Sequence, residues 1–141
     1  MQQKDYILRE IEKISVMIMG LLSKMVKRSK ENKVLDEKEF KDISQSMLSE
    51  GNFNIEAFLN IEEDQFDSYF KLDHGFDSKN TELIGDFLAM MAEIALFEQK
   101  KLYLTKAKQI YSYIDLTTKT FSVDRVTKMN NLEIRLENLS L

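Results

Sequence analysis

The residues that could do chemistry in this chain are few, and the single histidine is the first of them. His74 stands between two acids, Asp73 and Asp77, in the segment DHGFDSKN. An imidazole between carboxylates could bind a metal ion or move a proton. A calcium loop of the EF-hand type, however, would need an acid twelve positions along from Asp73, where Ile84 stands. We therefore interpret the segment as a solvated turn and predict no metal ligand.

A second candidate is the run of carboxylates in IEEDQFD, formed by Glu62, Glu63, Asp64 and Asp67. Two carboxylates act as acid and base only when one is desolvated and held opposite the other across a substrate. Neighbouring residues on a short helix point in different directions. We expect these four side chains to form a solvated face, and we predict no catalytic residue.

The remaining catalytic signatures are excluded by composition. One histidine cannot supply a two-histidine metal site or an H-E-x-x-H helix, and no motif in the sequence supports a serine triad built on it. The absence of cysteine excludes disulfides, thiolate zinc sites and a thiol nucleophile. No glycine-rich phosphate loop, G-x-S-x-G turn or dinucleotide fingerprint occurs. We predict a non-enzymatic protein without a cofactor, and keep an enzyme built from carboxylates, lysines and tyrosines as the last alternative.

The composition indicates which elements must carry these residues. The chain has 141 residues, enough for one ordinary domain, with 43% hydrophobic and 31% charged residues. It has no proline and four glycines, so it lacks the residues that punctuate β folds. We predict one all-α domain over residues 1–141, an antiparallel bundle or a short helical stack of about six to seven helices.

The opening segment, MQQKDYILREIEKISVMIMGLL, raises the question of a leader or a membrane anchor. Asp5, Glu10 and Glu12 interrupt it, and the apolar run over residues 16–22 is too short to cross a bilayer. The spacing predicts a central core helix over residues 5–29, capped by Asp5. Its apolar stripe comprises Ile7, Ile11, Ile14, Ile18, Leu21, Leu22 and Met25. We predict no membrane insertion.

Helix signals continue along the chain. Asp36 and Glu39 have the spacing of a capping box, Gly51 suits a left-handed C-terminal cap, and Asn54 suits the next N-cap. A helical hairpin is predicted over residues 80–114, with its first helix starting near Ser78 or Asn80. A last helix is predicted over residues 122–139, capped by Ser122, with Val123, Val126, Met129, Leu132 or Leu136, and Leu139 facing inward. Short links predict that consecutive helices pack antiparallel.

Two resemblances accompany these patterns. The segment DYILREIEKI resembles the start of a family of bacterial proteins of unknown function that begin D-Y-I-[LM]-R-x-I-E, and YLTKAKQIYSYID is similar to a later segment of that family. The resemblance implies a bacterial, cytoplasmic helical protein and brings no known activity. Residues 82–99 and 102–114 resemble a tetratricopeptide hairpin, with Ala107 and Tyr111 near its small and aromatic packing positions. The W-x-x-L-G-x-x-Y string and the closing proline are missing.

Charge is unevenly distributed along the chain. Residues 1–35 have a net charge of +4, residues 36–92 of −10 and residues 93–141 of +2. Such complementary segments can steer association with a partner or with another copy. The basic stretch KMVKRSKENK has no interleaved aromatic residues and the whole chain has a net charge of −4, so nucleic-acid binding is not predicted.

These observations predict a cytoplasmic helical scaffold that recognises a protein or peptide, or a second copy of itself. The candidate surface comprises Tyr103, Tyr111, Tyr113, Met17 and Met19, because aromatic and methionine side chains suit an adaptable interface. The alternative is a regulatory protein that binds a small molecule in an interhelical pocket lined by the three tyrosines. An enclosed polar cavity would favour the second function, and an open groove or an exposed apolar face the first.

Overall fold

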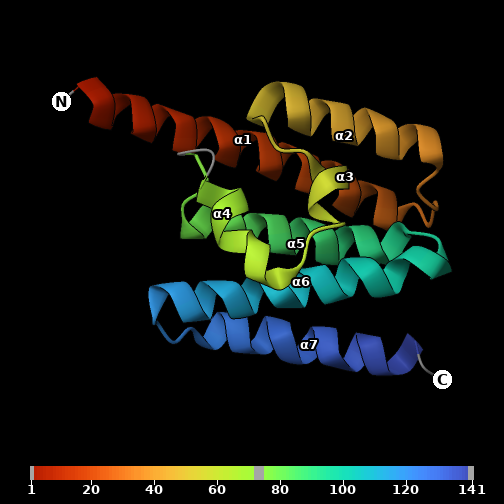
Figure 1. The fold of residues 1–141 in the computed structure, drawn as a ribbon. Coiled ribbons are helices and arrows are strands. Elements are labelled where there is room, and N and C mark those ends of the chain that lie inside the picture. The colour runs from red at the N-terminus through yellow and green to blue at the C-terminus, as the bar shows by residue number, and fades with distance from the viewer. Residues whose placement is uncertain (1, 72–74, 140–141) are drawn as a thin grey trace.

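The computed structural model describes residues 2–71 and 75–139, with side chains from residue 4, and within these ranges all regular structure is helical (Figure 1). This confirms the predicted all-α class. Asp73 and His74 of the predicted turn lie outside the described residues. The described chain contains seven α-helices and one short 3-10 helix, η1: α1 (Gln2–Lys30), α2 (Glu37–Gly51), α3 (Ile55–Phe58), η1 (Glu63–Gln65), α4 (Phe66–Lys71), α5 (Ser78–Ile94), α6 (Phe97–Thr118) and α7 (Val123–Leu139).

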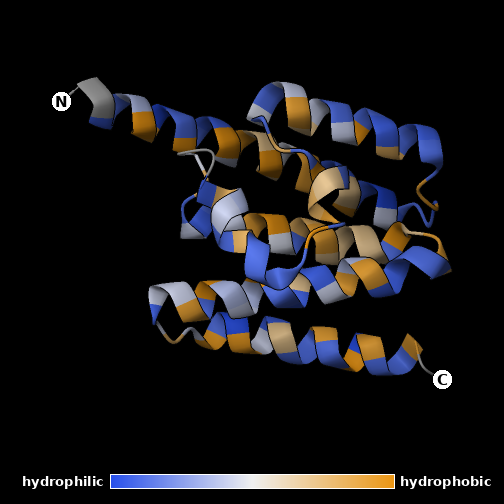
Figure 2. Ribbon diagram, viewed as in Figure 1, coloured by the Kyte–Doolittle hydropathy of each residue, from blue (hydrophilic) through white to orange (hydrophobic). Residues whose placement is uncertain are grey.

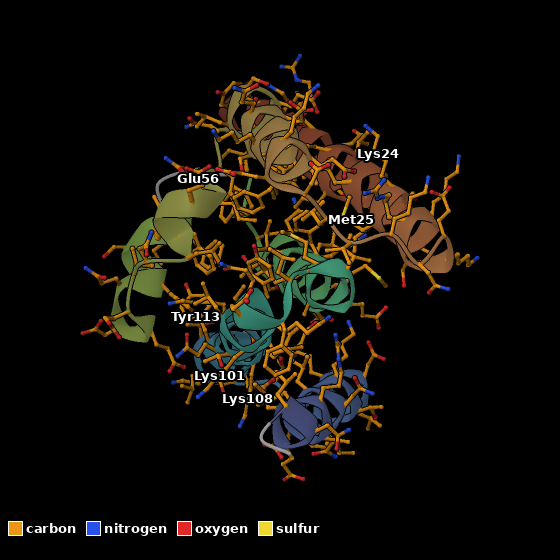
Figure 3. All side chains as sticks on the ribbon, turned by 90° about the vertical axis from the view of Figure 1, so that its right-hand side faces the viewer. Lys24, Met25, Glu56, Lys101, Lys108 and Tyr113 are labelled. Atoms are coloured by element: carbon orange, nitrogen blue, oxygen red, sulfur yellow. The ribbon has the colours of Figure 1, made fainter. Side chains whose placement is uncertain are left out.

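The long helices form a stack in which α1, α5, α6 and α7 follow one another, with α2 packed on α1 and the short α3 and α4 along one side of α5 and α6 (Figure 1 and Figure 3). Consecutive long helices are antiparallel, as predicted. α1 and α5 are not consecutive and run parallel. Asn80 at the start of α5 donates to the carbonyl of Ile11 at 2.8 Å, and the amide of Leu35, beyond the end of α1, donates to Ile94 at 2.7 Å.

Three helix starts follow their predicted caps. The amide of Glu39 donates to Asp36 at 2.8 Å and completes the capping box of α2. The amide of Ala57 donates to Asn54 at 3.0 Å. Ser122 accepts a hydrogen bond from the amide of Arg125 at 3.2 Å. Each side chain satisfies a backbone donor that the first helical turn leaves without an intrahelical partner.

Other boundaries differ from the predictions. α1 begins at Gln2, so Asp5 lies inside its first turn and is not the N-cap. α5 does begin at Ser78, one of its two predicted starts, and Asp77 is its cap, which accepts a hydrogen bond from the amide of Asn80 at 2.9 Å. Asn52, with a φ of 52°, takes the left-handed position expected for Gly51. Gly51 is the buried last residue of α2, where a Cβ would lie 2.7 Å from the Met17 side chain, so this glycine permits close packing of α2 on α1.

The core lies between α1, α5 and α6, with α5 at its centre. Ile14, Ile18 and Met25 of the predicted α1 stripe are buried, whereas Ile7 and Ile11 are only half-buried because the first turns of α1 project beyond the stack. The central helix is α5, and not α1 as predicted, because α5 is buried on more sides. Aromatic rings fill the side covered by α3 and α4: Phe53, Phe58, Phe66, Tyr69, Phe70, Phe76 and Tyr113.

Candidate interaction surface

Three of the five residues predicted for an interaction surface are buried. Tyr111 is 1% exposed, Tyr103 5% and Met17 6%. Met17 packs where Gly51 of α2 leaves room, and the Tyr111 ring packs against Gly85 of α5. The prediction that these three residues lie on the surface was therefore wrong, because their large side chains are buried in the core. Met19 is exposed and Tyr113 is half-buried.

Tyr111 belongs to a polar layer between α5, α6 and α7. Its hydroxyl donates to the Asp86 carboxylate at 2.5 Å, and the Lys128 ammonium lies 5.7 Å from its ring centroid. Burial, reinforced by the Asp86 charge, raises the pKa of the Tyr111 phenol well above its usual value. The phenol is therefore a hydrogen-bond donor that holds α6 to α5.

Two basic side chains of α7 complete this layer. Arg125 is buried, and its guanidinium donates to Asp115 at 2.6 Å and to Glu82 at 3.1 Å. The Lys128 ammonium lies 2.7 Å from Glu82 and 3.1 Å from Asp86. Burial acts to lower the pKa of Lys128, but the two carboxylates outweigh it and raise that pKa. These paired charges turn one side of α7 toward α5 and α6.

The polar layer explains why the predicted orientation of α7 was wrong at its start. Val123 and Val126 were expected inside, but the inner positions go to Arg125 and Lys128. The sequence carried a signal for this arrangement that was not used. Acids at positions 82 and 86 and bases at positions 125 and 128 each have helical spacing, so each pair lies on one face of its helix.

The predicted tyrosine-lined pocket is not a single cavity. Tyr111 lines a hollow of about 310 Å³ with Lys128 and Arg135, whereas Tyr113 lines a different hollow of about 410 Å³ with Asp67 and Lys71. The Tyr113 hydroxyl donates to Asp67 at 3.0 Å, and Lys71 pairs with the same carboxylate at 2.9 Å. Glu62, Glu63 and Asp64, like Asp67, are exposed, which confirms the solvated acidic face.

An open groove of about 400 Å³ runs between α1 and α2. Its floor consists of Leu21, Met25 and Ile43, each of which is already buried, and its rims carry basic and acidic side chains, including Lys24 and Asp42. Lys24 and Met25 are labelled in Figure 3. A partner bound in this groove would bury little additional apolar surface, because the side chains of the floor are already buried within the chain.

The edge of the stack at α7 is different. We define the α7 outer face as Val123, Val126, Asn130 and Ile134, which recur at the spacing of one helical stripe and point away from α6. Val123 is 70% exposed and Ile134 57%. Two further apolar side chains are exposed near this face: Leu116 in the last turn of α6, at 74%, and Phe121 in the α6–α7 turn, at 80%.

The opposite edge of the stack, formed by α2, is polar. Apart from Leu48, its exposed residues are charged or hydrophilic: Glu37, Lys38, Lys41, Asp42, Gln45, Ser49 and Glu50. Figure 2 shows hydrophilic residues over much of α2, and hydrophobic residues that alternate with hydrophilic ones along α7. Stacked helical proteins need polar outer faces on their terminal elements. By this criterion the α2 edge is capped and the α7 edge is not.

α1 also exposes apolar side chains, including Leu8, Val16 and Met19. Charged residues such as Glu12 and Lys13 separate them along the helix. Along the α7 outer face only the uncharged Asn130 separates the apolar side chains.

Among the described residues, no cluster of three or more acidic or histidine side chains is arranged to hold a metal ion. None of the helices in the described ranges has both the length and the apolar character that crossing a membrane requires. Comparison of the whole chain with protein-family models, with curated proteins and with solved structures finds no match in any of the three.

Proposed function

We propose that this chain is a non-catalytic helical module that binds a protein partner through the α7 outer face and the adjoining α6–α7 turn. The observation that carries the proposal is the contrast between the two edges of the stack. Ile134 and Phe121 are more than half exposed at the α7 edge, whereas α2 covers the other edge with polar side chains. Burying contiguous apolar side chains against a partner is favourable.

The non-catalytic part of the proposal is supported by the pairing of the most concentrated polar groups. Glu82, Asp86 and Asp115 form ion pairs with Arg125 and Lys128 inside the chain. Charges that neutralise one another in this way hold helices together, and they offer no unpaired acid or base to a substrate.

Site-specific photo-crosslinking tests the proposal. A photoreactive phenylalanine analogue at Phe121 should give a covalent adduct with another polypeptide in the native cell extract. The matched control is the same analogue at Val16, which is 66% exposed but lies on α1. An adduct from Phe121 alone supports the α7 edge as the binding surface. Equal adducts from both positions, or none from Phe121, would contradict it.

A second candidate function is small-molecule binding in the Tyr113 hollow. The observation that favours it is the set of three threonines, Thr81, Thr117 and Thr118, that line the hollow together with Asp67 and Lys71. Native mass spectrometry of the purified protein tests this function. A bound metabolite that is lost from the Asp67→Asn variant and retained by Glu56→Gln would support it.

Several finer predictions belong to the same proposal. Three of them stay predictions: a tetratricopeptide-like packing of residues 80–114, membership of the bacterial family suggested by DYILREIEKI, and a cytoplasmic location. Each agrees with a helical binding module, and the crosslinking experiment does not depend on any of them.

A further inference from the structure

We propose that the partner on the α7 outer face is a second copy of this chain, with the two α7 helices antiparallel about a two-fold axis at Asn130. This inference rests on the proposed function and names its partner. A two-fold contact uses the same surface on both copies, so its residues must complement themselves.

The spacing of residues on the α7 outer face meets that condition. Val126 and Ile134 lie four residues before and four residues after Asn130. With an antiparallel pair centred on Asn130, Val126 of one copy meets Ile134 of the other, and the same contact occurs twice. Both side chains point away from α6 and are at least 38% exposed.

Asn130 has the chemistry expected of the central position. Its side chain is exposed and makes no hydrogen bond in the part of the chain that the structure describes. An amide carries both donors and an acceptor, so two Asn130 side chains on the axis can bond to each other. A single polar residue in an apolar helical seam selects one register, because any other register leaves it unpaired.

Charge favours the antiparallel direction over the parallel one. The exposed Glu137 continues the stripe of the outer face toward the end of α7, whereas Glu133 pairs with Lys108 of α6 at 3.2 Å. Parallel helices would place Glu137 beside the same residue of the other copy, which is repulsive. Antiparallel helices move Glu137 toward the start of the other α7 helix, where the α6–α7 turn carries the exposed Lys119. The nearby Asp124 is already paired with Lys128 at 3.4 Å, so Lys119 supplies the opposite charge at both ends of the helix pair.

Charge substitutions at Val126 and Ile134 test both the partner and the register. Sedimentation velocity over a wide range of concentrations should show a dimer for the original chain. Ile134→Glu alone and Val126→Lys alone should each shift the population to monomer. The double variant Val126→Lys with Ile134→Glu should restore the dimer, because each new lysine faces a new glutamate of the other copy. The double variant Val126→Glu with Ile134→Glu should remain monomeric.

The control is Val16→Glu on α1, which should leave the dimer intact, and circular dichroism should show the same helix content for every variant. A parallel pair would set like charges against each other in the first double variant, so failure to restore the dimer overturns the register. A wild-type chain that stays monomeric at all concentrations overturns self-association. The photo-crosslinking experiment tests the proposed function separately. If the chain is monomeric, the proposed function fails only when the analogue at Phe121 also gives no adduct with any other protein.

Discussion

The guanidinium of Arg125 on α7 lies 2.6 Å from the carboxylate of Asp115 on α6. Arg125 also pairs with Glu82 on α5, so one side chain joins three helices. The Asp115 carboxylate, helped by Glu82, raises the pKa of the Arg125 guanidinium above its usual value. This contact decides which side of α7 faces inward, and therefore which residues remain on its outer face.

The first prediction concerns this anchor. Arg125→Ala should destabilise the chain by about 2 kcal/mol, since it leaves Asp115 without a cation and Glu82 with Lys128 alone. Urea unfolding followed by circular dichroism measures the change. The matched control is Arg9→Ala, which removes an exposed arginine of α1 and should have little effect. Equal stability of the two variants would show that the Arg125 contacts do not hold α7.

The second prediction compares two helical glycines. At Gly85 a Cβ would lie 2.8 Å from the Tyr111 ring, whereas at Gly20 it would meet nothing within 4 Å. Gly85→Ala should destabilise the fold, because overpacking costs about 1 to 3 kcal/mol and outweighs the gain in helix propensity. Gly20→Ala should stabilise α1 by up to about 1 kcal/mol. Thermal unfolding of both variants gives the comparison, and a stabilised Gly85→Ala variant would contradict the close packing of α5 on α6.

The third prediction tests α1 as a core helix. Ile18 is fully buried, and Met19 beside it is 53% exposed. Ile18→Asp should unfold the domain, since an unpaired buried charge costs several kcal/mol against a typical stability of about 5 to 15 kcal/mol. Met19→Asp should leave the fold intact. Circular dichroism and size-exclusion chromatography distinguish the outcomes, and a folded Ile18→Asp variant would show that α1 does not pack as described.

The fourth prediction concerns high pH. Burial raises the pKa of Tyr113 to about 12, with a further contribution from Asp67, and burial also raises the pKa of Tyr103. In the unfolded chain these phenols ionise near pH 10. Because the folded pKa values are the higher ones, their contribution to stability is complete below about pH 10 and is lost as the pH rises toward 12.

Helix content and tyrosinate absorbance, followed together during an alkaline titration, check this prediction. Ionisation of the buried tyrosines should coincide with loss of helix. In Tyr113→Phe the alkaline transition should become less steep, because one ionisable phenol is removed. Tyr6→Phe is the control, since Tyr6 is 53% exposed on α1 and should not change the transition. Full tyrosine ionisation with intact helices would contradict the burial of these phenols.

Local signals predicted the helices well but the orientation of α7 poorly. Asp36 and Asn54 cap their helices as expected, because a cap depends on residues within one turn of the chain. Val123 and Val126 were placed inside on their apolarity alone, and both are on the surface. Arg125 faces inward instead, because it pairs with acids on two other helices, and no local pattern in the sequence contains that pairing.

The same division applies to the candidate site and to the core. The side chains of Tyr103 and Tyr111 suit an interface or a core, and only tertiary packing decided for the core. Gly51 was a plausible cap from its neighbours in the sequence, yet the proximity of Met17 on another helix explains its presence.

The sequence by itself determined that the chain is helical, where most of its helices begin and end, and that its first helix supplies core residues. These properties depend on apolar spacing, capping residues and the lack of proline, all of which act over a few residues. Only the tertiary structure decided that α1 and α5 run parallel, that α5 is central and that the α7 edge exposes an apolar face. Those properties arise from contacts between residues far apart in the chain, whose partners cannot be read from local spacing.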